Sequence, residues 1–267
     1  MKKVAIITGG SSGIGKELVR VYSGEGYHVL FTGRNEDRLQ ATQKEFSTDE
    51  VECIGLKLDA SLEKDNKELI DQALEKFGRI DVLICNAGVS MRALFQDLEL
   101  DVFKKVMDIN FYGPIYAVKY ALPHLLASKG NIVAISSING HRSTPARSAY
   151  SASKFAMEGF FESLRTELLK SNVHVLVVNP GFTGTKIRVN ALDANGHTQG
   201  ESPRDERNMM SPGEVAERTF RAMKRKKRKL LLTRTGRWLV RLNYYFPGII
   251  DRIVYNVLAR EPDSPFK

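Results

Sequence analysis

The stretch that decides the fold lies near the start of the chain and reads Val4-Ala5-Ile6-Ile7-Thr8-Gly9-Gly10-Ser11-Ser12-Gly13-Ile14-Gly15. It begins as a short, mostly β-branched apolar run, which is typical of a buried strand, and the residues after it have helical spacing. Glycines between the two permit positive φ and let the backbone approach a pyrophosphate, and the following helix offers free N–H groups. This order predicts a dinucleotide site, although a purely structural turn could use the same glycines. The expected contacts are Gly9, Ser11, Ser12, Gly13, Ile14 and Gly15.

Short apolar runs and helical segments alternate along the rest of the chain. The runs lie at 4–8, 28–32, 53–58, 82–86, 131–136, 173–179 and 230–233. Helical spacing is found at 14–25, 36–45, 63–77, 101–126, 150–169 and 212–223. Continuously apolar strands that alternate with helices are typical of a parallel sheet buried on both faces. We therefore predict a doubly wound α/β fold of the Rossmann type, with helices on both sides of a seven-stranded parallel sheet.

Length and composition narrow the class of protein. The 267 residues, 42% hydrophobic and 27% charged, suit one globular domain over 1–267. The two cysteines, Cys53 and Cys85, each lie in an apolar run, which excludes a disulfide framework, and the five histidines are scattered, which argues against a metal site. The sequence has no signal-peptide core and no apolar stretch of about eighteen residues, so we expect a cytoplasmic protein.

Cofactor choice depends on the residues that follow the second predicted strand, Gly33-Arg34-Asn35. An NAD site typically has an acid at this position, where it binds the ribose 2′-hydroxyl. The Arg34 guanidinium could instead form a fork on a 2′-phosphate or stack on adenine, or it could be a solvated residue before a helix. Arg38 is a weaker candidate for the same role. We predict NADP(H) as the cofactor.

Tyr150 and Lys154 lie four residues apart at the start of a predicted helix, which brings them to one face. A phenol titrates near pH 10, and bringing its pKa to neutrality requires about 4 kcal/mol. A neighbouring ammonium group can supply much of this, helped by the positive charge of an oxidised nicotinamide. The pair is common by chance, and its meaning depends on the motifs around it.

Several short motifs occur in an order and spacing that are specific together. They are Thr8-Gly9-x-x-x-Gly13-x-Gly15, Asp59, Asn86-Ala87-Gly88, Asn110, Ser136-Ser137, Tyr150-x-x-x-Lys154 and Pro180-Gly181 with Thr185. With them, nearly the whole chain resembles the short-chain dehydrogenases/reductases. The resemblance implies metal-free hydride transfer between NADP(H) and a ketone or secondary alcohol, and a homodimer or homotetramer.

The resemblance also implies roles for individual residues. Tyr150 would be the general acid/base, and Lys154 would hold the nicotinamide ribose and lower the pKa of Tyr150. Ser137 would orient the substrate carbonyl, and Asn110 would support a water that links Lys154 to solvent. The other implied cofactor contacts run from the adenine to the carboxamide and are Asp59, Asn86, Ala87, Gly88, Pro180, Gly181 and Thr185.

Purely structural interpretations stay open for three of these sites. Ser136 is interpreted as a strand-end residue whose side chain turns away from the substrate. Asn110 could simply bend a long helix by bonding local backbone, and the turn at 86–88 could be architectural. Two other functions also stay open: an NADP(H)-holding sensor without turnover, and a tether that acts through a basic C-terminal segment.

The closer resemblance is to the branch of membrane-associated lipid, steroid and retinoid reductases, through residues 86–92, 147–150 and 189–196. We predict a substrate lid over 185–212, long enough to suit an apolar or lipid-like substrate. Beyond it we expect a basic amphipathic extension over 221–267. Residues 221–241 carry ten Lys or Arg and no acid, whereas the whole chain has a net charge of +9.

Two interpretations of this extension stay open. Apolar side chains are predicted to share one helical face, namely those of Ile249, Ile250, Ile253, Val254, Val257 and Leu258. With the basic run 224–229 and Trp238, this face could contact the inner surface of a membrane. It could equally pack on the core or on a second subunit. The local charge does not predict a specific nucleic-acid partner.

Overall fold

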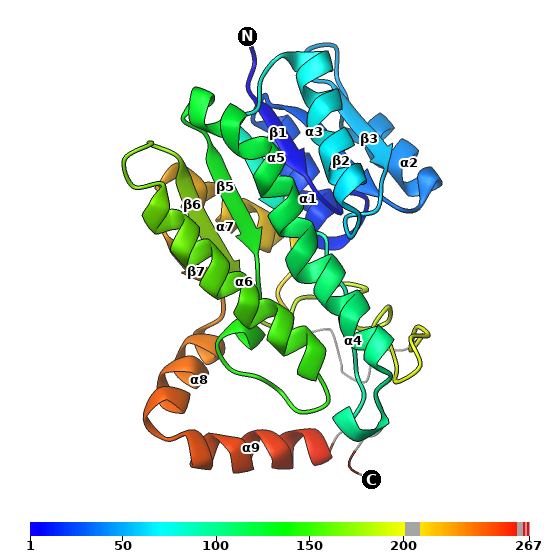
Figure 1. Cartoon of the computed structure of the whole chain (residues 1–267), viewed down its shortest axis with the longest axis vertical. Helices are drawn as coiled ribbons and strands as arrows, with labels where there is room; N and C mark the ends of the chain where they lie inside the picture. Colours follow the sequence, from blue (N-terminus) through cyan, green and yellow to red (C-terminus); the bar gives the residue numbers. More distant parts are fainter. Residues whose placement is uncertain (201–208, 261–263, 265, 267) are drawn as a thin grey trace.

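The computed structural model describes residues 1–200, 209–260, 264 and 266. Within them, a parallel sheet of seven strands has the order β3-β2-β1-β4-β5-β6-β7 (Figure 1). The strands are β1 (Val4–Ile7), β2 (His28–Gly33), β3 (Cys53–Lys57), β4 (Val82–Cys85), β5 (Asn131–Ile135), β6 (His174–Asn179) and β7 (Lys229–Leu231). The predicted fold class is confirmed.

Helices cover both faces of this sheet. They are α1 (Gly13–Gly24), α2 (Glu36–Phe46), α3 (Glu63–Phe77), α5 (Gly113–Ser128), α6 (Ser148–Glu167) and α7 (Pro212–Lys224). Three further helices, α4 (Leu100–Met107), α8 (Arg234–Tyr245) and α9 (Pro247–Ala259), add no side chain to the cores that pack on the sheet. Side chains of a strand point alternately to the two faces, and β1 illustrates the result. Ala5 and Ile7 pack in one core with α1 and α7, whereas Ile6 packs in a second core with α3, α5 and α6. Both faces of the sheet are therefore buried.

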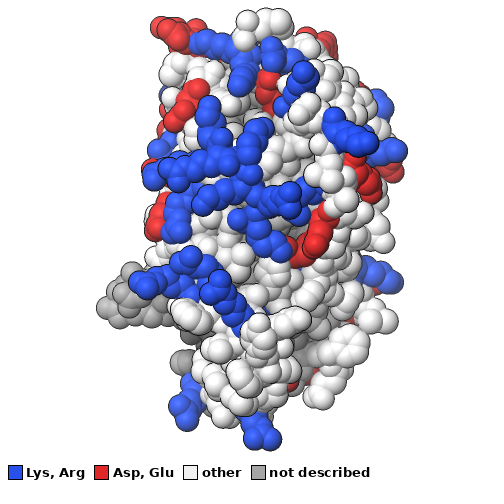
Figure 2. Space-filling view, turned by 90° about the vertical axis from the view of Figure 1, so that its left-hand side faces the viewer, with Lys and Arg blue, Asp and Glu red and all other residues white. Residues whose placement is uncertain are grey.

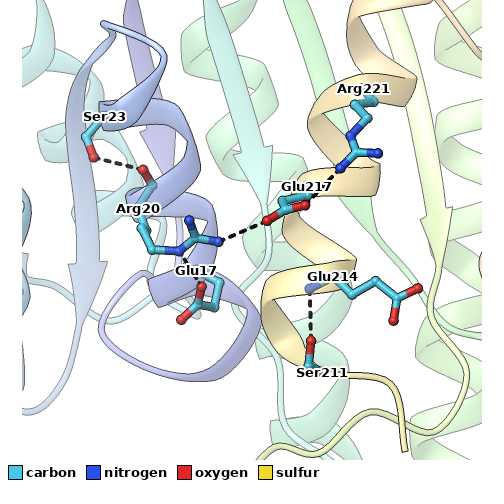
Figure 3. Close-up of polar contacts among 7 residues, drawn as sticks. All are labelled: Glu17, Arg20, Ser23, Ser211, Glu214, Glu217 and Arg221. Atoms are coloured by element: carbon cyan, nitrogen blue, oxygen red, sulfur yellow. Dashed lines mark hydrogen bonds and ion pairs between the residues drawn. The ribbon is translucent and has the colours of Figure 1, made fainter.

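Polar contacts join α1 to α7 above the first core (Figure 3). The Arg20 guanidinium lies 2.6 Å from a carboxylate oxygen of Glu17 and 3.6 Å from one of Glu217. At the start of α7, the Ser211 hydroxyl accepts a hydrogen bond from the backbone N–H of Glu214 at 3.1 Å. This N-cap satisfies a donor that the helix itself leaves unpaired, and it fixes where α7 begins beside the cleft.

The predicted helix at 101–126 is not continuous. The chain forms α4, then a wider π turn at Asp108–Tyr112, and then α5. Asn110 lies in this turn, and its carboxamide bonds the backbone of Val89 rather than that of its own helix. A contact between residues distant in the sequence therefore shapes the interruption.

The predicted extension at 221–267 is several elements: the end of α7, the edge strand β7, and the helices α8 and α9 (Figure 1). Its last part includes 261–263, 265 and 267, which lie outside the described residues, as does 201–208 in the predicted lid. Among the described residues, every helix is too short or too polar to span a bilayer. The six apolar residues predicted on one face lie on α9, and the structure buries them unequally. Three of them are exposed, namely Ile249, Ile253 and Val257. The other three are buried or half-buried, namely Ile250, Val254 and Leu258.

Candidate active site

A cleft opens at the carboxyl ends of the strands, where β1 and β4 are neighbours although their chain connections lead in opposite directions. Such a switch point leaves a crevice in which doubly wound proteins bind ligands. The cleft has a volume of about 1730 Å³. Every predicted cofactor residue lines it, namely Gly9, Ser11, Ser12, Gly13, Ile14, Gly15, Arg34, Asp59, Asn86, Ala87, Gly88, Tyr150, Lys154, Pro180, Gly181 and Thr185.

The glycine-rich turn has the backbone that its sequence predicts. Gly9 and Gly13 have positive φ values of 69° and 54°. A Cβ added at Gly15 would lie 2.0 Å from the Gly9 carbonyl oxygen, so a side chain cannot fit there. The N-cap residue of α1, Ser12, makes no side-chain hydrogen bond to the helix. The N–H groups and the positive dipole end of α1 are thus available for an anionic ligand in the cleft.

The turn at 86–88 both lines the cleft and holds the glycine-rich turn in place. The Asn86 amide donates hydrogen bonds to the carbonyl oxygens of Thr8 and Gly9, each at 3.0 Å. In return, the Thr8 hydroxyl accepts from the backbone N–H groups of Asn86 and Ala87, each at 3.0 Å. The architectural interpretation therefore applies to the Asn86 side chain, while the backbone of the turn faces the cleft.

Arg34 lies exposed on the cleft wall where β2 ends. It makes no ion pair with any carboxylate in residues 1–200 or 209–260, so its guanidinium is available to a ligand. Arg38 also lines the cleft, and its backbone N–H caps onto the side chain of Asn35 at 2.9 Å. Asp59 is engaged locally, because its carboxylate accepts from the hydroxyl of Ser61 at 2.7 Å.

Ser137, Tyr150 and Lys154 meet on the same cleft wall. Ser137 follows β5, where its hydroxyl accepts from the backbone N–H of Asn139 at 3.1 Å, and its side chain is hydrogen-bonded with Tyr150. Lys154 lies one turn beyond Tyr150 on α6, with its Nζ 5.9 Å from the centroid of the Tyr150 ring. The Lys154 ammonium donates to the carbonyl oxygen of Ile135 at 3.0 Å. By contrast, the Ser136 hydroxyl is buried with no hydrogen-bond partner among the described residues.

The protonation of this group differs from what the spacing of Tyr150 and Lys154 suggests. Burial raises the pKa of Tyr150, and the hydrogen bond with Ser137 opposes that rise. Burial also lowers the pKa of Lys154, to about 8, although the nearby carboxylate of Glu158 opposes this. The expected lowering of the Tyr150 pKa by Lys154 is therefore not found. Desolvation is the largest effect on Tyr150, and the groups that oppose it are Ser137, Arg147 and Arg188 rather than Lys154.

Asn110 does not line the cleft but lies directly behind it. Its side chain is fully buried, accepts from the Val89 N–H at 2.8 Å and donates to the Val89 carbonyl at 2.9 Å. A Cβ added at Gly88 would lie 3.2 Å from the Asn110 Oδ1 and 3.8 Å from the Lys154 Nζ. Asn110 and Lys154 therefore flank the same point of the backbone, at Gly88.

Glu158 is a buried residue near the site that the motifs do not indicate. Its carboxylate accepts from the Asn179 amide and pairs with the Lys229 ammonium at 3.0 Å and with the His141 ring at 3.4 Å. The one signal in the sequence is its position four residues after Lys154, which puts both on one face of α6. It joins α6 to β6 and β7 behind the cleft.

Comparisons with known proteins agree with this geometry. A family model described as short chain dehydrogenase matches residues 3–196. "Dehydrogenase/reductase SDR family member 7B" from Mus musculus is 36% identical over 267 residues, which covers 98% of this chain and 83% of that protein. "Dehydrogenase/reductase SDR family protein 7-like" from Drosophila melanogaster is 32% identical over 263 residues and covers 97% of this chain and 80% of that protein.

Solved structures are similar over most of the chain as well. An alcohol dehydrogenase from the archaeon Thermococcus sibiricus, complexed with 5-hydroxy-NADP, has a TM-score of 0.76 and 26% identity, and covers 87% of this chain and 96% of that one. A Burkholderia phymatum short-chain dehydrogenase/reductase in complex with NAD has a TM-score of 0.83 at 24% identity, and covers 93% and 95%. The family model over residues 3–196 and the two relatives above 30% identity show that the chain belongs to the short-chain dehydrogenase/reductase family of oxidoreductases.

Proposed function

We propose that this oxidoreductase uses NADP(H) to reduce an apolar or lipid-like ketone to a secondary alcohol, with Tyr150 as the general acid. The observation that carries the proposal is the meeting of Ser137, Tyr150 and a buried Lys154 on the wall of a cleft that also holds a glycine-rich turn. No metal ion is needed for this chemistry.

The residues of the cleft fit a dinucleotide. The uncapped start of α1 and the backbone of Gly13 would hold the pyrophosphate, because both offer N–H groups. Asp59 would lie toward the adenine, whereas Pro180 and Thr185 would lie toward the nicotinamide. The absence of space for a Cβ at Gly15 supports this assignment, because dinucleotide sites of this kind pack the first helix closely against the end of the first strand.

The preference for NADP(H) is based on Arg34. Its exposed guanidinium at the end of β2 could form two parallel hydrogen bonds with a 2′-phosphate. An acid that would accept from the 2′-hydroxyl of NAD is missing from Gly33-Arg34-Asn35. The Thermococcus sibiricus relative is complexed with an NADP derivative and the Burkholderia phymatum structure with NAD, so the choice depends on this chain's own residues.

The reduced nicotinamide, when bound, supplies a hydride to the carbonyl carbon. The hydroxyls of Ser137 and Tyr150 would donate hydrogen bonds to the carbonyl oxygen, where negative charge develops. Because burial raises the pKa of Tyr150, its phenol is protonated at neutral pH, which is the form that reduction requires. Lys154, with a pKa of about 8, can gain or lose a proton near neutrality and so re-supply the site.

An apolar substrate is supported by the side chains that face the cleft beyond the catalytic group. From the predicted lid, Ile187, Val189 and Leu192 line it, and Leu239 of α8 and Leu258 of α9 close the far side. A pocket with mostly apolar walls and a few directed polar groups selects ligands by their apolar body.

A panel of ketones from small polar to long-chain or polycyclic members tests the proposal. The rate at which NADPH absorbance is lost, and the yield of secondary alcohol, should be greatest for the apolar ketones. With NADH in place of NADPH, both should be small. Tight NADPH binding without turnover of any ketone would instead favour a cofactor-holding sensor.

A further inference from the structure

Exposed apolar side chains are concentrated on two helices at one end of the molecule. Of the eighteen exposed large apolar residues among those described, nine lie between 238 and 257. We call eight of them, which lie on α8, α9 and the residue between these helices, the α8–α9 surface. They are Trp238, Leu242, Tyr244, Tyr245, Phe246, Ile249, Ile253 and Val257. Contiguous exposure of this kind on a soluble protein usually marks an interaction site.

The spacing of these residues makes them a continuous surface. Trp238, Leu242 and Tyr245 follow one another at four and three residues on α8, so they form one stripe. On α9, Ile249, Ile253 and Val257 form a second stripe and are 59%, 49% and 55% exposed. The neighbouring stripe on α9, which is Ile250, Val254 and Leu258, is also apolar and is turned toward the protein, where Ile250 is 5% exposed. One apolar stripe of α9 is therefore buried by the fold, and the other is not.

Specific contacts fix both helices, so the exposed stripes have a defined position. The buried guanidinium of Arg142 pairs with the Asp251 carboxylate of α9 at 2.8 Å. The Thr233 hydroxyl caps α8 by accepting from the Gly236 N–H at 3.1 Å. Leu239 and Leu258, from the same two helices, line the catalytic cleft. The α8–α9 surface is therefore attached to the wall of the active site.

Positive charge lies beside the apolar stripes. Arg237 and Arg241 are exposed on α8, and the Arg241 guanidinium lies 5.9 Å from the centre of the Trp238 ring. Neither arginine pairs with a carboxylate of the described chain. In Figure 2, Lys and Arg form a broad band across the face that includes α7, β7 and α8, above a mainly uncharged area. Residues 225–227, which are all basic, are exposed between α7 and β7.

We propose that the α8–α9 surface docks on an anionic phospholipid membrane. Exposed aliphatic and aromatic side chains bordered by unpaired arginines suit the boundary between acyl chains and acidic headgroups. Nucleic acid would engage the basic band but would leave the Ile249, Ile253 and Val257 stripe in water. A symmetric pairing of two copies would bring the Arg237 and Arg241 side chains of both copies together, with no carboxylate on α8 to neutralise them.

Docking would place the cleft at the membrane surface, because α8 and α9 both wall it. A lipid-like ketone could then pass from the bilayer to Tyr150 without crossing bulk water. This consequence relies on the proposed function, whereas the docking itself does not, and lipid binding can be measured without any turnover.

The single tryptophan of the chain makes the test possible in the unaltered protein, because Trp238 lies on the proposed surface and is 60% exposed. With vesicles of phosphatidylcholine and phosphatidylglycerol, its emission should shift to shorter wavelength and be quenched by brominated acyl chains. Vesicles of phosphatidylcholine alone should bind much more weakly. Emission that does not change with anionic vesicles at low salt, together with no co-sedimentation, would overturn the proposal.

Variants separate the two contributions. Arg237→Gln/Arg241→Gln should weaken anionic-vesicle binding by about 30-fold, at about 1 kcal/mol for each charge near the surface. Lys44→Gln/Lys64→Gln removes the same charge from exposed positions on α2 and α3. This control should change binding less than twofold at moderate ionic strength, because charges more than about 10 Å from the lipid, the Debye length, are screened by salt. Equal loss in both pairs would show a non-specific charge effect and contradict the proposal.

The apolar contribution is tested by Ile249→Ser/Ile253→Ser, which should weaken binding by about 30-fold. Leu169→Ser, at a residue 66% exposed near the end of α6, is the control. Circular dichroism and melting verify that each variant folds. Unchanged lipid binding by the α9 variant would refute membrane docking. So would a dimer of the unaltered protein, seen in light scattering, that binds no vesicles and that the α9 substitutions dissociate. Binding to duplex DNA but not to vesicles would refute it as well.

Discussion

Replacing Arg34 by Ala should change the cofactor preference while leaving the fold intact. Arg34 is exposed and pairs with no carboxylate among the described residues, so its loss breaks no internal contact and should leave the free energy of unfolding unchanged. What is lost is a charge-assisted, forked contact with the 2′-phosphate. For an exposed site this contact contributes about 2 kcal/mol, which is about 30-fold in affinity. NADH has no 2′-phosphate and should lose almost nothing.

The assay measures the KM for NADPH and for NADH with one ketone at saturating concentration, in the unaltered protein and in Arg34→Ala. The ratio of the two KM values should change by about 30-fold. Arg38→Ala is a matched control, because it removes a second exposed cation from the same cleft wall and should change the ratio much less. Equal changes of KM for both cofactors in Arg34→Ala would refute the assignment of the 2′-phosphate to this residue.

Three further predictions concern the residues around Tyr150. Ser137→Ala should lower kcat by about 10²-fold with little change in NADPH affinity, because it removes a donor to the developing oxyanion; an unchanged kcat would contradict this. Burial lowers the pKa of Lys154 to about 8, so between pH 8 and 10.5 the unfolded chain keeps a proton that the folded chain has lost. The free energy of unfolding of the unaltered protein, compared with that of Lys154→Met, should therefore rise by on the order of 3 kcal/mol across this range. If denaturant unfolding gives a difference between the two proteins that does not change with pH, the lowered pKa of Lys154 is contradicted. Glu158→Gln should destabilise the fold by about 1 kcal/mol, because the partly exposed Lys229 ammonium loses its counter-charge; a melting temperature equal to that of the unaltered protein would exclude this role.

Much of the fold is predictable from the sequence, because a strand that is buried on both faces of a sheet requires a short, continuously apolar stretch. Such stretches are uncommon in other elements of a protein of this class. The strands found differ from the predicted ones by one or two residues at their ends. The break between α4 and α5 is not predictable in this way, since it depends on hydrogen bonds between Asn110 and Val89, twenty-one residues apart. Local periodicity contains no information on such a pairing.

The C-terminal helices show a second limit. The sequence pattern predicts no separate helix at Arg234–Tyr245, where arginines interrupt the apolar residues. On α9, the six apolar residues form one broad side, and the contacts of Ile250 and Asp251 decide which part of it is buried. Periodicity in the sequence predicts which positions of a helix are apolar. The elements that pack against the helix determine which of those positions are buried.

The site shows a third limit, because motif spacing gives proximity but not desolvation. Spacing correctly brings Tyr150 and Lys154 to one cleft wall, yet the pKa of Tyr150 is raised where the sequence analysis expects it to be lowered. Burial is a property of the assembled structure. The same holds for Glu158, which is four residues from Lys154 but becomes notable only when Asn179 and Lys229 close around it.

The most direct measurement is the turnover of Tyr150→Phe with NADPH and the best ketone of the panel, together with NADPH affinity. This change removes one hydroxyl and keeps the ring. If the phenol delivers the proton, turnover should fall by about 10³-fold, while the NADPH dissociation constant stays within about twofold. A variant that reduces the ketone within about tenfold of the normal rate would contradict the assignment of general acid catalysis to Tyr150.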